Sequence, residues 1–282
     1  MNSILLAGIQ VQPRETKQET LQRTLEFVDN AGRLKVSVAS LNDYFLSWPP
    51  DPEKSHEYVA AQAEPIPGPS INALQSKAKE YGMMICSGSI IEKDAAGKYY
   101  VSAVIIGKDG GVIAVHRKTE LFNGGLKFER DSGISAGTPD ARAYDTPLGK
   151  MGIILDTEVY NRNIIEEVIR QHPKLVFWPV SWTVRVTISA FGDHQITARY
   201  ISRQSKAYVI STNKVGLRRT HSKYNWAALR PESRSLIDLE HVNQVLYPGG
   251  TVIVSKSGTV IGAAEEFQDG MAVASIDLNE LK

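Results

Sequence analysis

Strand-like and helix-like segments alternate along almost the whole chain, and this alternation restricts its fold more than any other feature. Short apolar runs typical of buried strands are separated by segments whose apolar residues recur at helical spacing. Ser70 is predicted to cap one of these helices and Gly82 to end it. The predicted strands span residues 4–12, 34–41, 83–91, 150–155, 175–179, 208–213 and 272–276, and the predicted helices span 16–31, 70–81, 161–171 and 195–206. The pattern favours an α/β fold.

Two predicted β-hairpins interrupt the alternation and indicate mixed sheets. One spans residues 101–116 around Gly107-Lys-Asp-Gly-Gly111, and the other spans residues 251–264 around Lys256-Ser-Gly258. Because no Pro/Ser-rich linker or low-complexity tract divides the chain, residues 1–282 are predicted to form a single domain. The polar segment 217–246 has only fragmentary periodicity, which is typical of a lid, an interface arm or a mobile insert.

The composition is that of an ordinary globular protein and excludes several classes. Hydrophobic residues make up 42% of the chain and charged residues 22%, which rules out disordered and fibrous proteins. The formal net charge of +1 provides no general attraction to nucleic acid or to anionic lipid. No apolar stretch approaches ~18 residues, and the N-terminal segment does not resemble a signal peptide. We therefore expect a cytoplasmic protein without nucleic-acid or membrane partners.

The usual catalytic motifs are absent from the sequence. It contains no P-loop, no dinucleotide-binding glycine fingerprint, no nucleophile-elbow serine and no histidine pair at zinc-binding spacing. Its single cysteine, Cys86, excludes an intramolecular disulfide framework and a cysteine-rich metal site. No metal or other cofactor is therefore expected, and the sequence supports neither a zinc site nor a covalent serine–histidine mechanism.

The chemically informative residues lie in two segments that are far apart in the chain. Lys118, in His116-Arg-Lys-Thr-Glu-Leu-Phe122, lies just past the end of a predicted strand, and Asp156 lies where the apolar run Met151-Gly-Ile-Ile-Leu155 stops. The carboxyl ends of strands are common places for catalytic groups in α/β proteins. Together with Ala63-Glu-Pro-Ile-Pro-Gly-Pro-Ser70, these segments resemble the nitrilase, or carbon–nitrogen hydrolase, superfamily.

The resemblance continues in order over nearly the whole chain. Further similar segments are Gln10, Tyr81-Gly82, Gly88-Ser-Ile90, Trp178-Pro-Val-Ser-Trp182, Tyr208-Val-Ile-Ser-Thr-Asn-Lys-Val-Gly216, Gly249-Gly-Thr-Val-Ile253 and Gly258. The resemblance implies a four-layer α-β-β-α sandwich with mixed sheets and a small-molecule substrate. It also implies a homodimer or a higher homo-oligomer, formed through residues 160–171 and the helix near Gln195.

That family uses a glutamate base, a lysine that stabilises the oxyanion, a second glutamate and a cysteine nucleophile. Lys118 matches the lysine, and Glu129 is the expected second glutamate. Asp43 stands in place of the first glutamate with a shorter side chain, and the position of the nucleophile falls on Asp156. Three residues that flank matched positions are expected to bind the substrate: Tyr44, Glu158 and Trp182.

Without a thiol at position 156, the thioester route of the family is closed. Cys86 lies in the middle of a predicted strand and is expected to be a buried structural residue. The favoured interpretation is acid–base chemistry, in which Asp43, Glu129 and Asp156 crowd around Lys118 and one carboxyl keeps its proton. Such a site would act on an amide-, amidine- or nitrile-related substrate by hydrolysis, dehydration or cyclisation.

The sequence is also compatible with two different roles for this cluster. The main one is that of a catalytically inactive, nitrilase-like pseudoenzyme that acts as a binding or assembly partner. The second is that of a hydrolase in which the Asp156 carboxylate itself attacks the substrate. A divalent metal in the acidic cluster is disfavoured, because Lys118 would compete for the same carboxylates.

Overall fold

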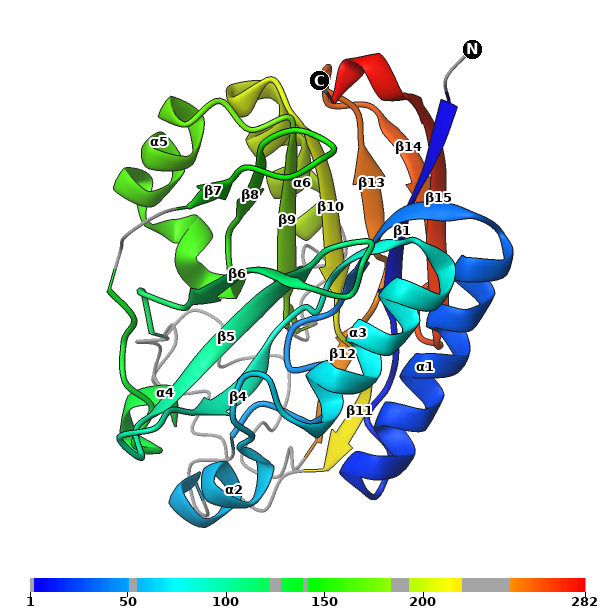
Figure 1. Cartoon of the computed structure of the whole chain (residues 1–282). Coiled ribbons are helices and arrows are strands. Elements are labelled where there is room, and N and C mark those ends of the chain that lie inside the picture. The colour runs from blue at the N-terminus through cyan, green and yellow to red at the C-terminus, as the bar shows by residue number, and fades with distance from the viewer. Residues whose placement is uncertain are drawn as a thin grey trace.

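Two β-sheets packed face to face form the centre of the computed structural model, which describes residues 3–50, 55–121, 128–138, 142–183, 193–219 and 244–281 (Figure 1). The first sheet has the strand order β15 (Gly270–Asp277), β1 (Ser3–Gln10), β2 (Val36–Leu41), β3 (Met84–Cys86), β5 (Tyr99–Ile106) and β4 (Ile90–Lys93), and β6 (Val112–Arg117) also pairs with β5. The second sheet has the order β14 (Val260–Ala263), β13 (Val252–Val254), β10 (Tyr208–Asn213), β9 (Leu175–Val180), β8 (Met151–Ile153) and β7 (Ala143–Tyr144). Both sheets combine parallel and antiparallel pairs, as predicted.

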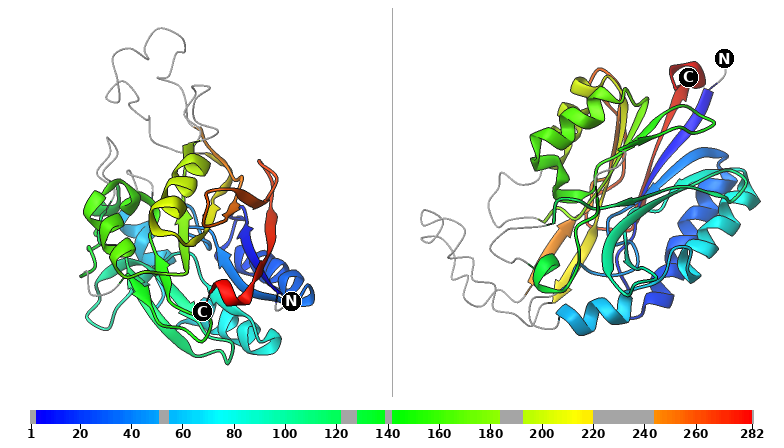
Figure 2. Two further views of the ribbon diagram at one scale, coloured as in Figure 1. Left: turned by 90° about the horizontal axis from the view of Figure 1, so that it is seen from above. Right: turned by 60° about the vertical axis from the view of Figure 1, so that its left-hand side comes forward.

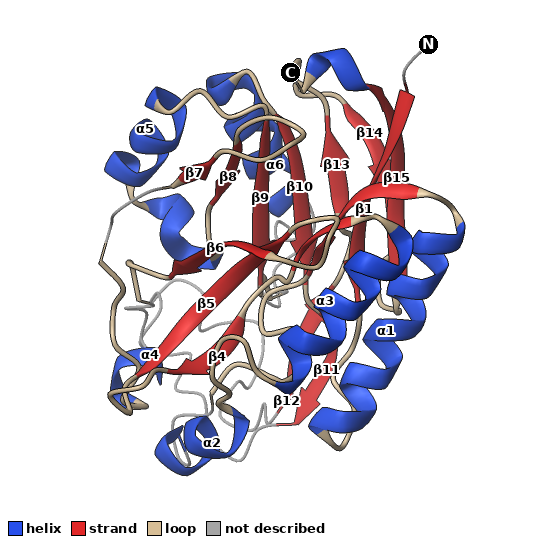
Figure 3. Cartoon of the chain, viewed as in Figure 1, coloured by secondary structure: helices blue, strands red, loops and turns tan. Residues whose placement is uncertain are grey.

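Helices cover the outer face of each sheet and complete a four-layer α-β-β-α sandwich (Figure 2 and Figure 3). The first sheet is covered by α1 (Lys17–Arg33) and α3 (Pro69–Tyr81), and the second by α5 (Arg162–Arg170) and α6 (Asp193–Ser205). The described connections contain α2 (Ser55–Gln62), α4 (Phe128–Asp131) and a short 3-10 helix, Asp156–Tyr160, and a further 3-10 turn, Leu278–Glu280, follows β15. The fold implied by the family resemblance is therefore confirmed.

Alternating side chains of the strands fill three apolar layers. In β1, Leu6 belongs to the layer between the sheets, whereas Ala7 belongs to the layer that contains α1 and α3. Phe177 of β9 lies in the central layer, and its neighbour Trp178 lies in the layer that contains Ala198 of α6. Because both faces of these strands are buried, they appear in the sequence as continuous apolar runs.

The start of α3 corrects one prediction. Gly68, not Ser70, is the N-cap residue, and the helix begins at Pro69. Ser70 instead donates hydrogen bonds from its backbone nitrogen and its Oγ to the Glu64 carboxylate, at 2.9 and 2.7 Å. A carboxylate next to the first turn of a helix satisfies free N–H groups and interacts favourably with the helix dipole. The capping group therefore comes from the preceding loop.

The predicted strand 83–91 is divided into β3 and β4. Gly88, between them, has a φ of 67°, and a Cβ atom at this position would lie 2.1 Å from the carbonyl oxygen of Asn42. Glycine is needed here both for the left-handed backbone and for the close approach. The break therefore brings residues 87–89 against the loop that follows β2.

The segment 217–246 differs from a simple polar loop at both of its ends. There β11 (Val215–Arg219) pairs in antiparallel fashion with β12 (Gln244–Pro248), while residues 220–243 lie outside the described residues.

At the opposite end of the sandwich, β1 and β15 pair from Ser3 and Asp277 onward, so the two ends of the described chain lie side by side (Figure 1). In the part of the chain that the structure describes, no helix is long and apolar enough to cross a membrane.

Candidate active site

The four predicted catalytic residues lie together at the end of the sandwich opposite the termini. Asp43 follows β2, Lys118 follows β6, Glu129 belongs to α4, and Asp156 starts the 3-10 helix after β8. Lys118 Nζ donates to both Glu129 oxygens at 2.8 and 3.1 Å, and to Asp156 Oδ2 at 3.0 Å. The predicted convergence is therefore observed, and we call these four residues the carboxylate–lysine cluster.

The loop that carries Asp43 is held in place by its neighbours in the fold. Asn42 Oδ1 accepts a hydrogen bond from the Val11 backbone nitrogen at 3.1 Å. The Tyr44 backbone nitrogen donates to Ser89 Oγ at 2.8 Å, and Tyr44 has a φ of 45°. A bulky residue in this left-handed region is rare and persists only where surrounding contacts enforce it. The contacts with residues 87–89, made possible by Gly88, supply that constraint.

The Asp43 carboxylate is completely buried and has two hydroxyl partners. Ser89 Oγ donates to Oδ1, and Ser181 Oγ donates to Oδ2 at 2.7 Å. Burial, with a further contribution from the nearby charge of Asp156, raises the pKa of Asp43 to about 7, against the opposing effects of Lys118 and the two serines. Asp43 can therefore exchange a proton near neutral pH.

Lys118 remains an ammonium ion in spite of complete burial. Burial alone would lower its pKa, but Glu129, Asp156 and Asp43 together outweigh that effect and raise the pKa above its usual value. Tyr44 contributes indirectly, because its hydroxyl donates to Glu129 Oε1 at 2.9 Å. Tyr44 therefore contacts the cluster itself, and its predicted role in substrate binding stays a prediction.

Asp156 is the member of the cluster that faces outward. Its side chain is 15% exposed, compared with 0% for Lys118 and 1% for Glu129. The residue has a φ of 45°, and its Oδ1 accepts a hydrogen bond from the Ser181 backbone nitrogen at 3.2 Å. Its carbonyl oxygen accepts from Trp178 Nε1 at 3.1 Å. Solvent therefore reaches the cluster at the position where the family resemblance places the nucleophile.

Glu158, which the sequence predicts to bind the substrate, is completely buried, and its role in substrate binding stays a prediction. Its carboxylate accepts hydrogen bonds from the backbone nitrogens of Thr119 and Leu155, both at 2.8 Å. Additional contacts to Glu158 come from Thr119 Oγ1, His116 Nε2 and Arg142 Nη1. The neighbouring His116 and Arg142 outweigh the effect of burial and lower its pKa. Glu158 thus links the residue after Lys118 to the residue before Asp156.

Trp182 lies in a row of aromatic rings beside Asp156. Its ring centroid is 6.4 Å from that of Trp178 and 5.9 Å from that of Tyr160. Its backbone nitrogen donates to Asn213 Oδ1 at 2.9 Å, and its side chain is half-buried. A partly exposed aromatic ring next to the outward face of the cluster is well placed to contact a ligand.

Two residues near the cluster were missed from the sequence. One is Ser181, whose position directly after an apolar strand was the available signal. The other is Lys214, which is completely buried and donates from Nζ to the carbonyl oxygens of Tyr44 and Ser47, both at 2.9 Å. Burial is the main cause that lowers the pKa of Lys214 to about 7. A lysine at the end of the apolar run 208–213 was the corresponding signal.

The only cysteine of the chain lies elsewhere, between the two sheets. Cys86 is completely buried in the central apolar layer, and burial raises the pKa of its thiol to about 12. A thiol of this kind is inert as a nucleophile. Over the described residues, no group of three or more His, Cys, Asp or Glu side chains is arranged to hold a metal ion.

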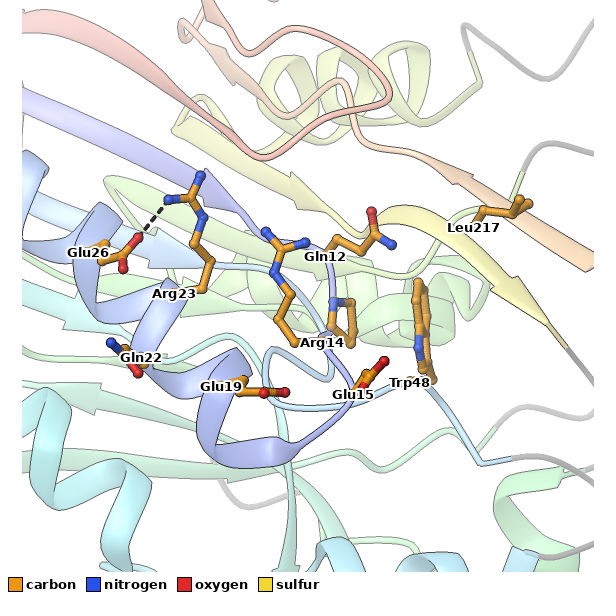
Figure 4. A pocket seen from close by; sticks show the side chains of 10 residues that line it. Gln12, Arg14, Glu15, Glu19, Gln22, Arg23, Glu26, Trp48 and Leu217 are labelled. Atoms are coloured by element: carbon orange, nitrogen blue, oxygen red, sulfur yellow. Dashed lines mark hydrogen bonds and ion pairs between the residues drawn. The ribbon is translucent and has the colours of Figure 1, made fainter.

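A cavity of about 780 Å³ lies at the surface beside α1 and shares no lining residue with the carboxylate–lysine cluster (Figure 4). Both arginines that line it are engaged in ion pairs. Arg23 pairs with Glu26 at 2.6 Å, and both Arg14 and Arg23 pair with Asp269. This cavity is therefore separate from the site described above.

Comparison with known proteins agrees with this architecture. Residues 5–282 match the sequence model of the carbon–nitrogen hydrolase family. The omega-amidase NIT2 of Bos taurus is 27% identical over 285 residues, which cover 100% of this chain and 91% of that protein. The omega-amidase NIT2 of Mus musculus is 33% identical over 157 residues, which cover 54% of each chain.

Solved structures show the same fold at lower sequence identity. The carbon–nitrogen hydrolase of Helicobacter pylori G27 superposes with a TM-score of 0.77 at 16% identity, covering 99% of this chain and 91% of that one. Saccharomyces cerevisiae Nit3, a nitrilase-superfamily member, superposes with a TM-score of 0.75 at 20% identity, covering 99% and 92%. With the match over residues 5–282 and the shared sandwich, this chain belongs to the carbon–nitrogen hydrolase family.

Proposed function

We propose that this chain is an enzyme that hydrolyses a small amide by acid–base chemistry in place of cysteine chemistry. The observation that carries the proposal is the carboxylate–lysine cluster, in which a buried cation contacts two carboxylates and a third carboxylate lies nearby. Burying so many charges for packing alone is costly, which favours a chemical use. Membership of the carbon–nitrogen hydrolase family and similarity to omega-amidases favour an amide as the substrate.

In this proposal, Asp43 moves the proton and Lys118 stabilises negative charge. Asp43, with its pKa of about 7, accepts a proton from the hydroxyl group that attacks the amide carbon. It then returns this proton to the nitrogen of the substrate amide as that nitrogen leaves. Lys118 stabilises the oxyanion that forms on the substrate carbonyl oxygen. The Asp156 carboxylate, on the exposed side of the cluster, accepts hydrogen bonds from the N–H groups of the substrate amide. It turns away from Lys118 as the negative charge develops on the substrate carbonyl oxygen.

A non-catalytic role is the second candidate, and one observation favours it. The Asp156 carboxylate is bound by both Lys118 Nζ and the Ser181 backbone nitrogen, at 3.0 and 3.2 Å. In the proposed hydrolysis, these two donors would instead bind the substrate oxyanion. In the non-catalytic role, Asp156 permanently occupies them, and the chain serves as a binding or assembly partner.

Ammonia release from a panel of small amides, including ω-amides of dicarboxylic acids, tests the proposal. Wild type should release ammonia from at least one amide, and Asp43→Asn and Asp156→Asn should each lower that rate by ~10²-fold or more. Asp145→Asn is the matched control, because the Asp145 side chain is 89% exposed and outside the cluster. If wild type hydrolyses none of the amides while Asp156→Asn melts at a higher temperature, the non-catalytic role is correct.

A further inference from the structure

We propose that Ser181 Oγ is the attacking nucleophile of this enzyme and that Asp43 is its base. The inference rests on the proposed amide hydrolysis and adds a covalent acyl-enzyme intermediate to it. It assigns a catalytic role to a residue that lies on a different sheet from Asp43 and 138 positions away in the chain.

The hydrogen bond between the two residues has the geometry of an activated nucleophile. Ser181 follows β9 directly, and its Oγ donates to Asp43 Oδ2 at 2.7 Å. This distance is typical of a hydroxyl group bound to a carboxylate. An activated nucleophile also needs a base that is oriented by a third group. Ser89 fulfils this requirement, because its Oγ donates to the other oxygen of Asp43.

The two serines that contact Asp43 differ in their surroundings. Ser89 is completely buried, and its Oγ also accepts a hydrogen bond from the Tyr44 backbone nitrogen at 2.8 Å. Ser181 is only partly buried, and its backbone nitrogen donates to Asp156, the exposed member of the cluster. Of the two hydroxyl groups, that of Ser181 is therefore the one that a substrate can approach.

The position of Ser181 also places it beside the group that stabilises an oxyanion. The Asp156 carboxylate bridges two donors: its Oδ1 accepts from the Ser181 backbone nitrogen at 3.2 Å, and its Oδ2 accepts from Lys118 Nζ at 3.0 Å. A substrate carbonyl oxygen that displaced this carboxylate would meet both donors, while its carbon faced Ser181 Oγ. The nucleophile, base and oxyanion donors thus surround one point at the mouth of the cluster.

The covalent step balances with the groups that are present. Ser181 Oγ attacks the amide carbon, its proton passes to Asp43, and the negative charge moves to the carbonyl oxygen beside Lys118. The tetrahedral intermediate collapses, Asp43 returns the proton to the nitrogen, and ammonia or an amine leaves. Water then attacks the Ser181 ester with Asp43 as base, and the carboxylic acid leaves as Ser181 recovers its proton.

Acylation by p-nitrophenyl acetate, followed by peptide mass mapping, tests the assignment. We expect a burst of p-nitrophenol and one acetyl group on the peptide that contains Ser181. Ser181→Ala should lose both the burst and the label, and should lower amide hydrolysis by ~10³-fold or more. Ser89→Ala is the matched comparison, since it also removes one hydrogen bond to Asp43. It should slow acylation but leave the label on Ser181.

The outcomes separate this inference from the proposed function. If Ser181→Ala hydrolyses amides at the wild-type rate, or if the acetyl group lies on Asp156 or another residue, the assignment of Ser181 is wrong while amide hydrolysis stands. If wild type carries the label on Ser181 but hydrolyses no amide, the nucleophile is supported and the proposed function fails.

A thiol variant provides a second measurement that does not depend on a substrate. Ser181→Cys places a thiol next to Asp43, while the only native thiol, Cys86, is buried and unreactive. Iodoacetamide should modify Ser181→Cys once and wild type not at all. The rate should fall at least ~10-fold when Asp43→Asn is added, because the base that forms the thiolate is then removed. An unreactive Ser181→Cys variant would overturn the proposal.

Discussion

Lys118 Nζ lies 3.0 Å from Asp156 Oδ2, and this contact joins the two sheets of the sandwich. Lys118 follows β6 of the first sheet, and Asp156 follows β8 of the second. Lys118 is completely buried, so its ion pair with Asp156 forms only when both sheets have packed together. The same contact therefore affects both the stability of the fold and the chemistry of the candidate site.

Replacing Lys118 by methionine should separate these two effects. Lys118→Met leaves Glu129 and Asp156 without their cation, so it should destabilise the fold by about 3 kcal/mol or more. Adding Glu129→Gln to Lys118→Met should restore part of this stability, measured by thermal melts. Turnover should fall by ~10²-fold or more in both variants, because neither retains the oxyanion partner. Recovery of activity together with stability in the double variant would contradict the role of Lys118.

The pH dependence of turnover should report the protonation of Asp43. As a base, Asp43 acts in its ionised form, so kcat/KM should rise with pH through the pKa of about 7. Asp156 is one cause of that raised pKa, so Asp156→Asn should move the rising limb of the profile to lower pH in whatever activity remains. A limb that does not move in Asp156→Asn would show that another group titrates there.

The stability of the fold should depend on the same carboxyl group, and no substrate is needed to measure it. The folded-state pKa of Asp43 is raised from 3.8 to about 7, so the folded state keeps a proton that the unfolded state releases. Stability is therefore lost as pH rises from the unfolded to the folded pKa.

Asp43→Asn removes this titration. Its melting temperature relative to wild type should increase from about pH 5 to about pH 8, by an amount equivalent to about 3 kcal/mol or less. Asp145→Asn, at an exposed carboxylate, should show no such trend. A constant difference between Asp43→Asn and wild type across this range would contradict the raised pKa.

Lys214 should position the loop that carries Asp43. Lys214→Met removes both hydrogen bonds from Nζ to the Tyr44 and Ser47 carbonyl oxygens. The Tyr44 carbonyl oxygen still accepts a hydrogen bond from the Ser47 backbone nitrogen at 3.0 Å, whereas the Ser47 carbonyl group loses its donor. Leaving one buried carbonyl group unsatisfied costs about 1–3 kcal/mol. We expect faster hydrogen–deuterium exchange in residues 43–48 and a ~10-fold or greater loss of turnover from the displaced base. Unchanged exchange in this loop with normal activity would show that Lys214 only fills space.

The second copy expected from the family resemblance should bind at the outer face of α6. Ile196 and Tyr200, four residues apart on α6, are 64% and 55% exposed, and Tyr160 is 66% exposed. Large apolar side chains at such exposure are typical of protein interfaces. In sedimentation equilibrium at micromolar concentration, wild type should be at least a dimer, and Ile196→Glu should shift it toward the 31.1 kDa monomer.

Leu34→Glu provides the control for this experiment. Leu34 is also exposed, at 52%, but it follows α1 on the first sheet, away from α6. It should leave the association unchanged. A wild-type protein that sediments only as a monomer would contradict the expected assembly.

Most of the secondary structure could be predicted from local patterns in the sequence, and the four-layer fold from the family resemblance. Buried strands such as β9 and β10 appear as continuous apolar runs, and helices such as α5 appear as apolar residues at helical spacing. These patterns are local, because they reflect which side of each element is buried. The family resemblance also indicated that Asp43, Lys118, Glu129 and Asp156 would converge.

The hydrogen-bond partners of the buried polar groups could not be predicted in this way, because they depend on how the whole chain packs. The donors around Glu158 come together through the packing of the segment after β6 against the turn after β8. Ser181 directly follows an apolar strand, but it is the close approach of the two sheets that places its Oγ 2.7 Å from Asp43. Hydrogen bonds and pKa shifts depend on distances of a few ångströms between residues far apart in the chain. Such distances are determined by the packing of the whole sandwich, which local periodicity does not specify.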